Sequence, residues 1–244
     1  MKAKSLLIFP VLLAVTASSN SVSAAVALDR TRVIVDGDKK AITLNIRNEN
    51  KSLPFLAQGW LENEAGEKVQ GPLMVVPPLQ RLEPDSKGQL KIQPLPATNA
   101  LPQDRETLYY FNLREIPPKS ETANTLQLAL QTRIKLFYRP QGIIVDKNAP
   151  APQQQLTLKQ QNGAYTVVNP TPYYVTLVAA GKSTSDKLKN FDPIMVAPKS
   201  EMNLGASSAQ IGAAPVLTYI NDYGGRPQLQ FTCTAQQCTA KEVK

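Results

Sequence analysis

The chain of 244 residues contains no histidine. Serine and cysteine hydrolases that rely on an imidazole base are therefore excluded, and the commonest metal ligand in proteins is missing. Carboxylates that could serve as acids or bases, such as Asp85, Asp104 and Asp222, are dispersed along the chain, so no catalytic set can be assembled from them. We therefore expect a protein that is not an enzyme, uses no cofactor and holds no metal.

Long apolar runs are also scarce. One run, residues 6–14, follows Lys2 and Lys4 and precedes small residues that end at Ala24. This order is typical of a secretory signal peptide. The run is shorter than the roughly 20 residues that a membrane-spanning helix needs. We expect residues 1–24 to be a signal peptide, and the remainder to be an exported soluble protein without membrane insertion.

Only two cysteines are present, Cys233 and Cys238. In an exported protein, two cysteines five positions apart are expected to form a disulfide, across a hairpin in this case. A zinc site would need further ligands of the right kind, which the chain does not offer nearby.

Charge is not concentrated in any one segment. The formal net charge is +8, but the basic residues are scattered among acids such as Glu62, Glu64 and Glu67 rather than gathered into arms. A positive balance could indicate a nucleic acid or an anionic membrane as partner. The scatter favours an ordinary solvated surface, and we expect no nucleic-acid partner.

Helical periodicity is nearly absent, while short alternating runs recur between turn residues. They predict strands at 31–35, 41–47, 55–61, 89–93, 107–114 and 126–138. Asp36-Gly37 is a hairpin signal between the first two strands, and proline pairs mark loops at 77–78 and 117–118. Strands at this spacing are typical of an antiparallel sandwich.

A proline-rich segment, residues 147–152, has the composition of a linker. Strand patterns resume beyond it at 155–159, 164–168, 173–179, 216–220 and 228–233. The sequence therefore predicts an all-β protein with two domains of unequal size, 25–146 and 147–244.

The stretch "TLQLALQTRIKLFYRP", residues 125–140, is the most unusual pattern. Leu126, Leu128 and Leu130 begin an alternation that continues to Tyr138, whereas strands usually have about 5 to 6 residues. An apolar face on a strand is more often simply the core of its own domain. A lysine, Lys135, interrupts the opposite face.

Several blocks together resemble the periplasmic pilus-assembly chaperones of the PapD class. They are "ALDRTRVIVDG", "NKSLPFLAQGWLENE", "LPQDRETLYYFNLREIPPKSE", "LQLALQTRIKLFYRP", "NPTPYYVTL" and "YINDYGGRPQLQF", which span almost the whole exported chain. The resemblance implies two immunoglobulin-like domains set in an L, with a cleft between them. It also implies a non-enzymatic role, in which pilus subunits are escorted through the periplasm to an outer-membrane usher.

The resemblance assigns a role to two cations. In that class a basic pair at the base of the cleft holds the C-terminal carboxylate of the subunit, and the matching positions are Arg32 and Lys135. A guanidinium offers a planar fork to a carboxylate, and an ammonium adds a compact charge. Without the resemblance, both would be read as ordinary surface cations.

The resemblance also implies that Leu126, Leu128 and Leu130 lie on an exposed edge and are lent to a subunit whose own sheet lacks a strand. It places Glu106, Arg139 and Asp222 in an ion cluster between the domains. Trp60, Phe111 and Tyr138 are interpreted as core or near-core aromatics.

The connection at residues 116–125 is short. Within the PapD class, a short connection at this place is typical of the branch that assembles rod-forming, adhesive pili, so the resemblance implies that branch. The expected partners are therefore pilins, an adhesin and an usher. Because an exposed apolar edge invites pairing, a self-capping homodimer is a further expectation for the free protein. The alternative from another class is a secreted adhesion or carbohydrate-binding module on the same scaffold. Such a module would need aromatic platforms, but only 6% of the residues are aromatic.

Overall fold

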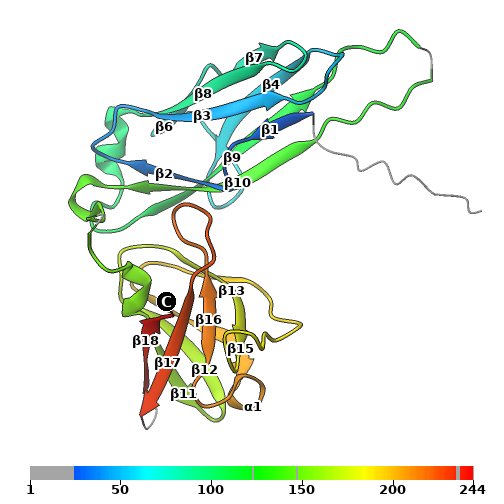
Figure 1. Ribbon diagram of the computed structural model, residues 1–244. Helices are drawn as coiled ribbons and strands as arrows, with labels where there is room; N and C mark the ends of the chain where they lie inside the picture. The colour runs from blue at the N-terminus through cyan, green and yellow to red at the C-terminus, as the bar shows by residue number, and fades with distance from the viewer. Residues whose placement is uncertain (1–24, 123, 147, 235–236, 244) are drawn as a thin grey trace, which may run out of the picture.

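The computed structural model describes residues 25–122, 124–146, 148–234 and 237–243. The expected signal peptide lies outside these residues. Strands dominate the described part, and they divide into two domains stacked along the chain, with the first running across the end of the second (Figure 1). Among the described residues, no helix is long and apolar enough to cross a membrane.

Two sheets face each other in the first domain. One has the order β1-β3-β8-β6, and the other has the order β2-β10-β9-β4-β5, with β7 also paired to β4. Their bounds are β1 Val26–Leu28, β2 Arg32–Asp36, β3 Ile42–Asn48, β4 Phe55–Glu62, β5 Lys68–Val69, β6 Leu73–Val76, β7 Leu79–Leu82, β8 Lys87–Pro94, β9 Thr107–Ile116 and β10 Gln131–Arg139.

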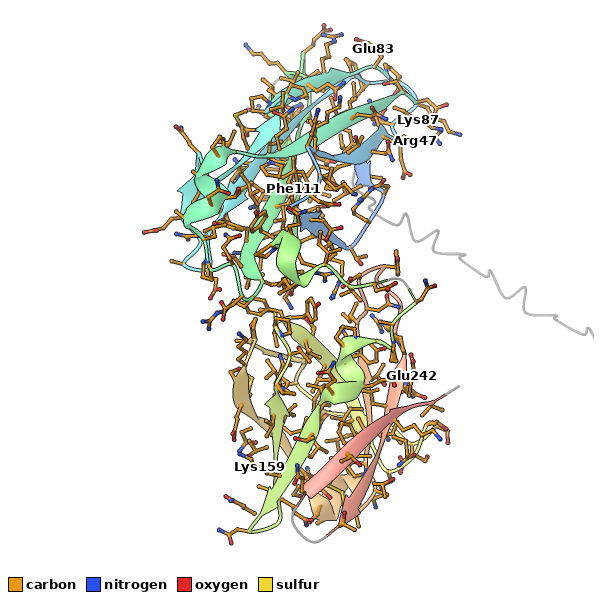
Figure 2. The ribbon with its side chains drawn as sticks, turned by 90° about the vertical axis from the view of Figure 1, so that its left-hand side faces the viewer. Arg47, Glu83, Lys87, Phe111, Lys159 and Glu242 are labelled. Carbon is orange, nitrogen blue, oxygen red and sulfur yellow. A yellow bond between two sulfur atoms is a disulfide. The ribbon has the colours of Figure 1, made fainter. Side chains whose placement is uncertain are left out.

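The core of the first domain lies between these sheets because apolar residues alternate along the strands. In β4, Phe55, Ala57, Gly59 and Leu61 point inward. A Cβ at Gly59 would lie 2.9 Å from a methyl of Leu90 on the other sheet, so glycine lets the two layers approach closely there. Figure 2 shows Phe111 in this interior, whereas Arg47 and Lys87 point away from it.

The second domain contains one eight-stranded sheet with the order β14-β13-β16-β17-β18-β11-β12-β15. The sheet folds over on itself, because its two end strands contact each other. The bounds are β11 Thr157–Gln161, β12 Ala164–Asn169, β13 Val175–Gly181, β14 Ile194–Val196, β15 Ser200–Ser207, α1 Ser208–Ile211, β16 Val216–Tyr219, β17 Gln228–Thr234 and β18 Gln237–Glu242. A separate apolar core fills this domain.

The prediction of an all-β protein with two immunoglobulin-like sandwich domains is confirmed. In the described part of the chain, three short 3-10 helices lie in the connections: η1 (Pro96–Ala100), η2 (Gln141–Ile143) and η3 (Pro152–Gln155). The last two follow β10 and lead into the second domain. The predicted boundary between residues 146 and 147 stays a prediction, since Lys147 lies outside the described residues.

The predicted hairpin at Asp36-Gly37 is wrong. A turn does form there, with the N–H of Lys39 donating to the carbonyl of Asp36 at 3.0 Å. The two strands it joins, β2 and β3, belong to opposite sheets, and β2 pairs with β10 in parallel. A turn signal fixes where the chain reverses, but it does not decide whether the strands pair or cross between layers.

The long strand predicted at 126–138 is also corrected. Regular pairing begins only at Gln131, and residues 126–130 precede β10 without a strand partner among the described residues. Alternation reports which side chains share a face, whereas strand assignment needs a ladder to a neighbouring backbone, and the described residues form none along 126–130.

Trp60 differs from the other two aromatics that were expected in the core. Phe111 and Tyr138 are buried in the first domain. Trp60 lies on the outer face of β4, where Lys68 and Arg114 stack on its ring at 4.6 and 5.1 Å from the centroid. It is therefore a partly buried surface aromatic, and its indole N–H donates to Glu62.

Candidate functional site

The register between β2 and β10 brings two cations together. Arg32 and Lys135 are paired positions at the point where the parallel ladder begins. Their neighbours Val33 and Leu136 face the core, so both cations point to the outer face of the sheet. Two residues more than 100 positions apart in sequence are thus adjacent, and we call them the cationic pair.

Arg32 is buried although it lies on an outer face, because the second domain covers it. Only 8% of the residue is exposed, and its Nη1 donates to the carbonyl of Ile220 at 3.1 Å. The guanidinium carbon lies 5.9 Å from the ring centroid of Phe137. Its Nε has no hydrogen-bond partner among the described residues. The buried guanidinium of Arg32 therefore has an N–H group that donates to no described residue.

In the free protein, burial disfavours the charged forms of both members of the cationic pair. Burial lowers the pKa of Lys135 below its ordinary value, and the charge of Arg32 lowers it further. Burial likewise lowers the pKa of Arg32, although distant Asp222 and Glu106 oppose this effect. No ion pair of either cation occurs in the described part of the chain. An anion placed between them would favour both charged forms and so offset these penalties.

Residues 126–130, which we call the leucine segment, lead into β10 at the end opposite the second domain. The exposed fractions are 83% for Leu126, 61% for Leu128 and 37% for Leu130. Gln127 points the other way and ties the segment to the chain, since its Nε2 donates to the carbonyl of Pro118 at 2.6 Å. The leucines are thus exposed as the resemblance implied.

One edge of β10 is open along its first residues. On one side β9 pairs with it from Gln131 to Tyr138, but on the other side β2 pairs only from Lys135 onward. Within the described residues, the edge of the leucine segment and of positions 131–134 therefore has no partner on the β2 side. This open edge ends at the cationic pair, where Arg32 begins β2.

The cluster Glu106, Arg139 and Asp222 is assembled between the domains. Arg139 Nη2 lies 2.7 Å from Glu106 Oε1, and Arg139 Nη1 lies 2.9 Å from Asp222 Oδ2 on the second domain. Burial raises the pKa of Glu106 to about 7, although Arg139 and the N–H of Tyr174 favour its ionised form. The two carboxylates raise the pKa of Arg139 against its own burial.

Tyr174 lies in the same region, and no sequence signal pointed to it beyond its place in the "NPTPYYVTL" block. Its backbone N–H donates to Glu106 Oε2 at 2.8 Å, and its hydroxyl donates to Glu64 Oε1 at 2.8 Å. Its ring centroid lies 5.5 Å from that of Phe137. Tyr174 therefore ties the second domain to the face of β10 that carries Lys135.

Comparison with known proteins shows which family combines these features. Two family models match the chain. Residues 25–144 match "Pili and flagellar-assembly chaperone, PapD N-terminal domain", and residues 151–231 match "Pili assembly chaperone PapD, C-terminal domain". The chain belongs to the PapD chaperone family. The resemblance noted from the sequence blocks is thereby confirmed.

Individual relatives agree with the family models. The chain is 50% identical over 223 residues to the chaperone protein PapD of Escherichia coli, with 91% of this chain and 92% of that protein covered. It is 44% identical over 223 residues to the chaperone protein PmfD of Proteus mirabilis, with 90% and 87% covered. The crystal structure of the periplasmic chaperone SfaE is 32% identical, with a TM-score of 0.65 and 84% and 98% covered.

Two further observations concern the cysteines and the metal-ligating side chains of this PapD-family chain. Cys233 and Cys238 are paired positions in the β17–β18 hairpin and form a disulfide, as predicted. Among the described residues, no group of three or more cysteine, aspartate or glutamate side chains gathers as a metal site would require.

Proposed function

We propose that this protein is a periplasmic chaperone that binds, stabilises and caps pilus subunits and delivers them to an outer-membrane usher. In this proposal the leucine segment completes the sheet of the subunit, and the cationic pair holds the subunit's C-terminal carboxylate. Membership of the PapD family and the relatives that are named chaperones support this role. The observation that carries it is the open edge of β10, which ends at the cationic pair.

The open edge and the proposed carboxylate anchor together set the direction of the incoming strand. A strand added to the edge cannot pass Lys135, because β2 occupies the edge beyond that residue. With its C-terminal carboxylate held at the cationic pair, the strand therefore comes from the leucine segment and ends at Arg32. Such a strand runs parallel to β10, in line with β2, and its terminal carboxylate arrives at the cationic pair. Strand addition to a free edge supplies main-chain hydrogen bonds to both partners.

The cationic pair suits a carboxylate better than it suits any group of the free protein. Arg32 has an unused Nε–H, and the pKa of Lys135 is lowered by burial beside a like charge. Charge-assisted hydrogen bonds to a carboxylate are roughly twice as strong as neutral ones. Binding at a chain terminus also fixes register, since a slip of one residue would turn every leucine away from the subunit's groove.

The leucine segment supplies the apolar part of the interaction. Burying a leucine side chain contributes about 1.5 to 3 kcal/mol. The three exposed leucines therefore offer on the order of 5 to 9 kcal/mol before the costs of association are subtracted. The cationic pair and the leucine segment both contact the same incoming strand of the subunit. The loss of either should therefore weaken capture of the whole subunit.

Delivery, location and self-association complete the proposal. Residues 1–24 would direct export, residues 25–146 would form the domain that lends the strand, and residues 147–244 would form the second wall of the cleft. In the absence of a subunit, the exposed leucines favour a self-capping homodimer. The short 116–125 connection supports assignment to the branch that assembles rod-forming, adhesive pili.

The test compares two synthetic peptides that carry the C-terminal strand of a pilus subunit, one with a free carboxylate and one with a terminal amide. The wild-type protein should bind the free acid at least tenfold more tightly. Arg32→Ala and Lys135→Ala should abolish that preference, whereas Arg47→Ala, which removes an exposed cation from β3, should keep it. Equal binding of the acid and the amide by the wild type would refute the anchor.

A further inference from the structure

Residues 220–225, which we call the inter-domain loop, belong to the connection between β16 and β17 and reach the cationic pair. Figure 1 shows it rising from the second domain toward the first. The carbonyl of Ile220 accepts from Arg32, and Asp222 binds Arg139. Gly224 lies so close to the first domain that a Cβ there would be 2.7 Å from Thr31 Oγ1.

The conformation of this loop is fixed from within. The Oδ1 of Asn221 accepts from the N–H of Tyr223 at 3.1 Å and from that of Gly225 at 2.8 Å. The N–H of Gly224 donates to the carbonyl of Asn221 at 3.0 Å. Gly224 has φ +83°, a region that favours glycine. Contacts to the first domain and bonds within the turn therefore hold the loop in one arrangement.

Tyr223 is the residue of this loop whose side chain is left in solvent. It is 92% exposed, the largest exposed fraction among the large hydrophobic side chains of the described residues. Tyr223 lines the same groove between the domains as Arg32, Arg139 and Asp222. A loop held by these bonds thus presents a tyrosine ring to a groove that is also lined by Arg32 of the cationic pair.

We propose that Tyr223 is a third contact for the subunit's C-terminal segment, made from the second domain. This inference rests on the proposed function. The ring packs against the residues that immediately precede the terminal carboxylate, and it favours an apolar side chain there. Tyrosine supplies a large contact area with few rotatable bonds, so little conformational entropy is lost when the ring is covered. Tyr223 is therefore a specificity-determining residue of the carboxylate site.

The experiment measures binding of the free-acid and amide peptides to the full exported chain. Tyr223→Ala should weaken binding of the free acid about tenfold, which corresponds to about 1.4 kcal/mol. Tyr223→Phe should keep the wild-type affinity, because the ring and not the hydroxyl makes the contact. Met202→Ala, on the second domain and 38% exposed, is the matched control and should change nothing.

A spectroscopic readout separates contact from a merely structural effect. In Tyr223→Trp the new indole should be solvent-exposed, and its emission should shift to shorter wavelength when the free-acid peptide binds. Unchanged affinity of Tyr223→Ala, or an emission that does not respond to the peptide, would overturn the inference. In either case a retained preference for acid over amide would leave the proposed function standing. Absence of that preference in the wild type would instead refute the carboxylate anchor of the proposed function.

Discussion

The backbone N–H of Glu115 donates to the carbonyl of Leu130 at 3.0 Å. This bond marks the point at which the leucine segment leaves the sheet of the first domain. Beyond it, toward Leu126, the described backbone has no strand partner, and the side chain of Gln127 donates to the carbonyl of Pro118. The protein therefore presents a backbone segment whose hydrogen-bonding groups are not committed to its own sheet.

Leu128→Glu should reduce affinity for a pilus subunit by at least about 100-fold. The loss combines the burial of one leucine, about 1.5 to 3 kcal/mol, with the cost of placing a charge in an apolar groove. Folding should be unaffected, because Leu128 is 61% exposed. Titration of a purified subunit into the variant measures the affinity, and thermal unfolding checks the fold.

The matched control for Leu128→Glu is Ala129→Glu. It adds the same charge one position along, where alternation points the side chain to the opposite face. Its effect should be several-fold smaller. Equal losses in the two variants would mean that charge alone, and not the apolar face, decides capture.

Binding of the free-acid peptide should weaken as pH rises into the alkaline range. The pKa of Lys135 in the free protein is below its ordinary value of 10.5, and a bound carboxylate raises it. Affinity is therefore full below the free-state pKa and falls, by up to tenfold per pH unit, as pH rises from that value to the bound-state pKa. Calorimetry at a series of pH values measures this dependence.

Lys135→Arg provides the control for that pH dependence, because a guanidinium keeps its charge across the same range. Its affinity should be nearly flat with pH, even if the absolute value differs from that of the wild type. A wild-type curve as flat as that of the variant would show that the Lys135 ammonium does not contact the bound group.

The sequence could predict which side chains share a face, but not which backbones meet. The alternation from Leu126 to Tyr138 predicted that the leucines and Lys135 lie on opposite faces. It could not show that the pairing of β2 with β10 begins at Lys135, because that contact joins positions about 100 residues apart. For the same reason the sequence predicted a hairpin at Asp36-Gly37, although the strands on either side of it, β2 and β3, belong to different sheets.

Several strands of the second domain escaped sequence analysis because their patterns are weak. β15 (Ser200–Ser207) contains few apolar residues, and β14 (Ile194–Val196) is too short to show alternation. Tertiary contacts, rather than local preference, decide their conformation. The ion cluster and the cationic pair were assigned only through the family resemblance, since isolated charges carry no signal of their eventual neighbours.

Arg139→Ala should destabilise the protein by about 3 to 5 kcal/mol, because it leaves the buried Glu106 carboxylate without its counter-charge. The Glu106 side chain is only 2% exposed. Asp222→Asn is the comparison, and it should cost under about 1 kcal/mol, since the Asp222 side chain is 35% exposed. Urea unfolding measures both, and similar losses would contradict a central role for Glu106.

The cost of Arg139→Ala should also depend on pH. The pKa of Glu106 in the folded wild type is about 7, above its ordinary value of 4.5. Its proton therefore stabilises the fold fully below pH 4.5, and this contribution is lost as pH rises to 7. Loss of Arg139 raises the folded-state pKa further, so the variant should lose more stability than the wild type between pH 5 and 8. A pH-independent difference would mean that Glu106 does not titrate in this range.

Removing the disulfide should weaken the second domain without affecting subunit capture. The bond joins adjacent strands of one hairpin and closes a loop of about five residues, for which the chain-entropy model gives about 2 kcal/mol. The double variant Cys233→Ala/Cys238→Ala should unfold at lower urea concentration by that amount. Because the hairpin lies away from β2 and β10, affinity for the free-acid peptide should stay at the wild-type value. Reduction of the wild type with a thiol should reproduce the shift and leave the double variant unchanged; a shift in the reduced variant as well would show that the thiol acts elsewhere than on this bond.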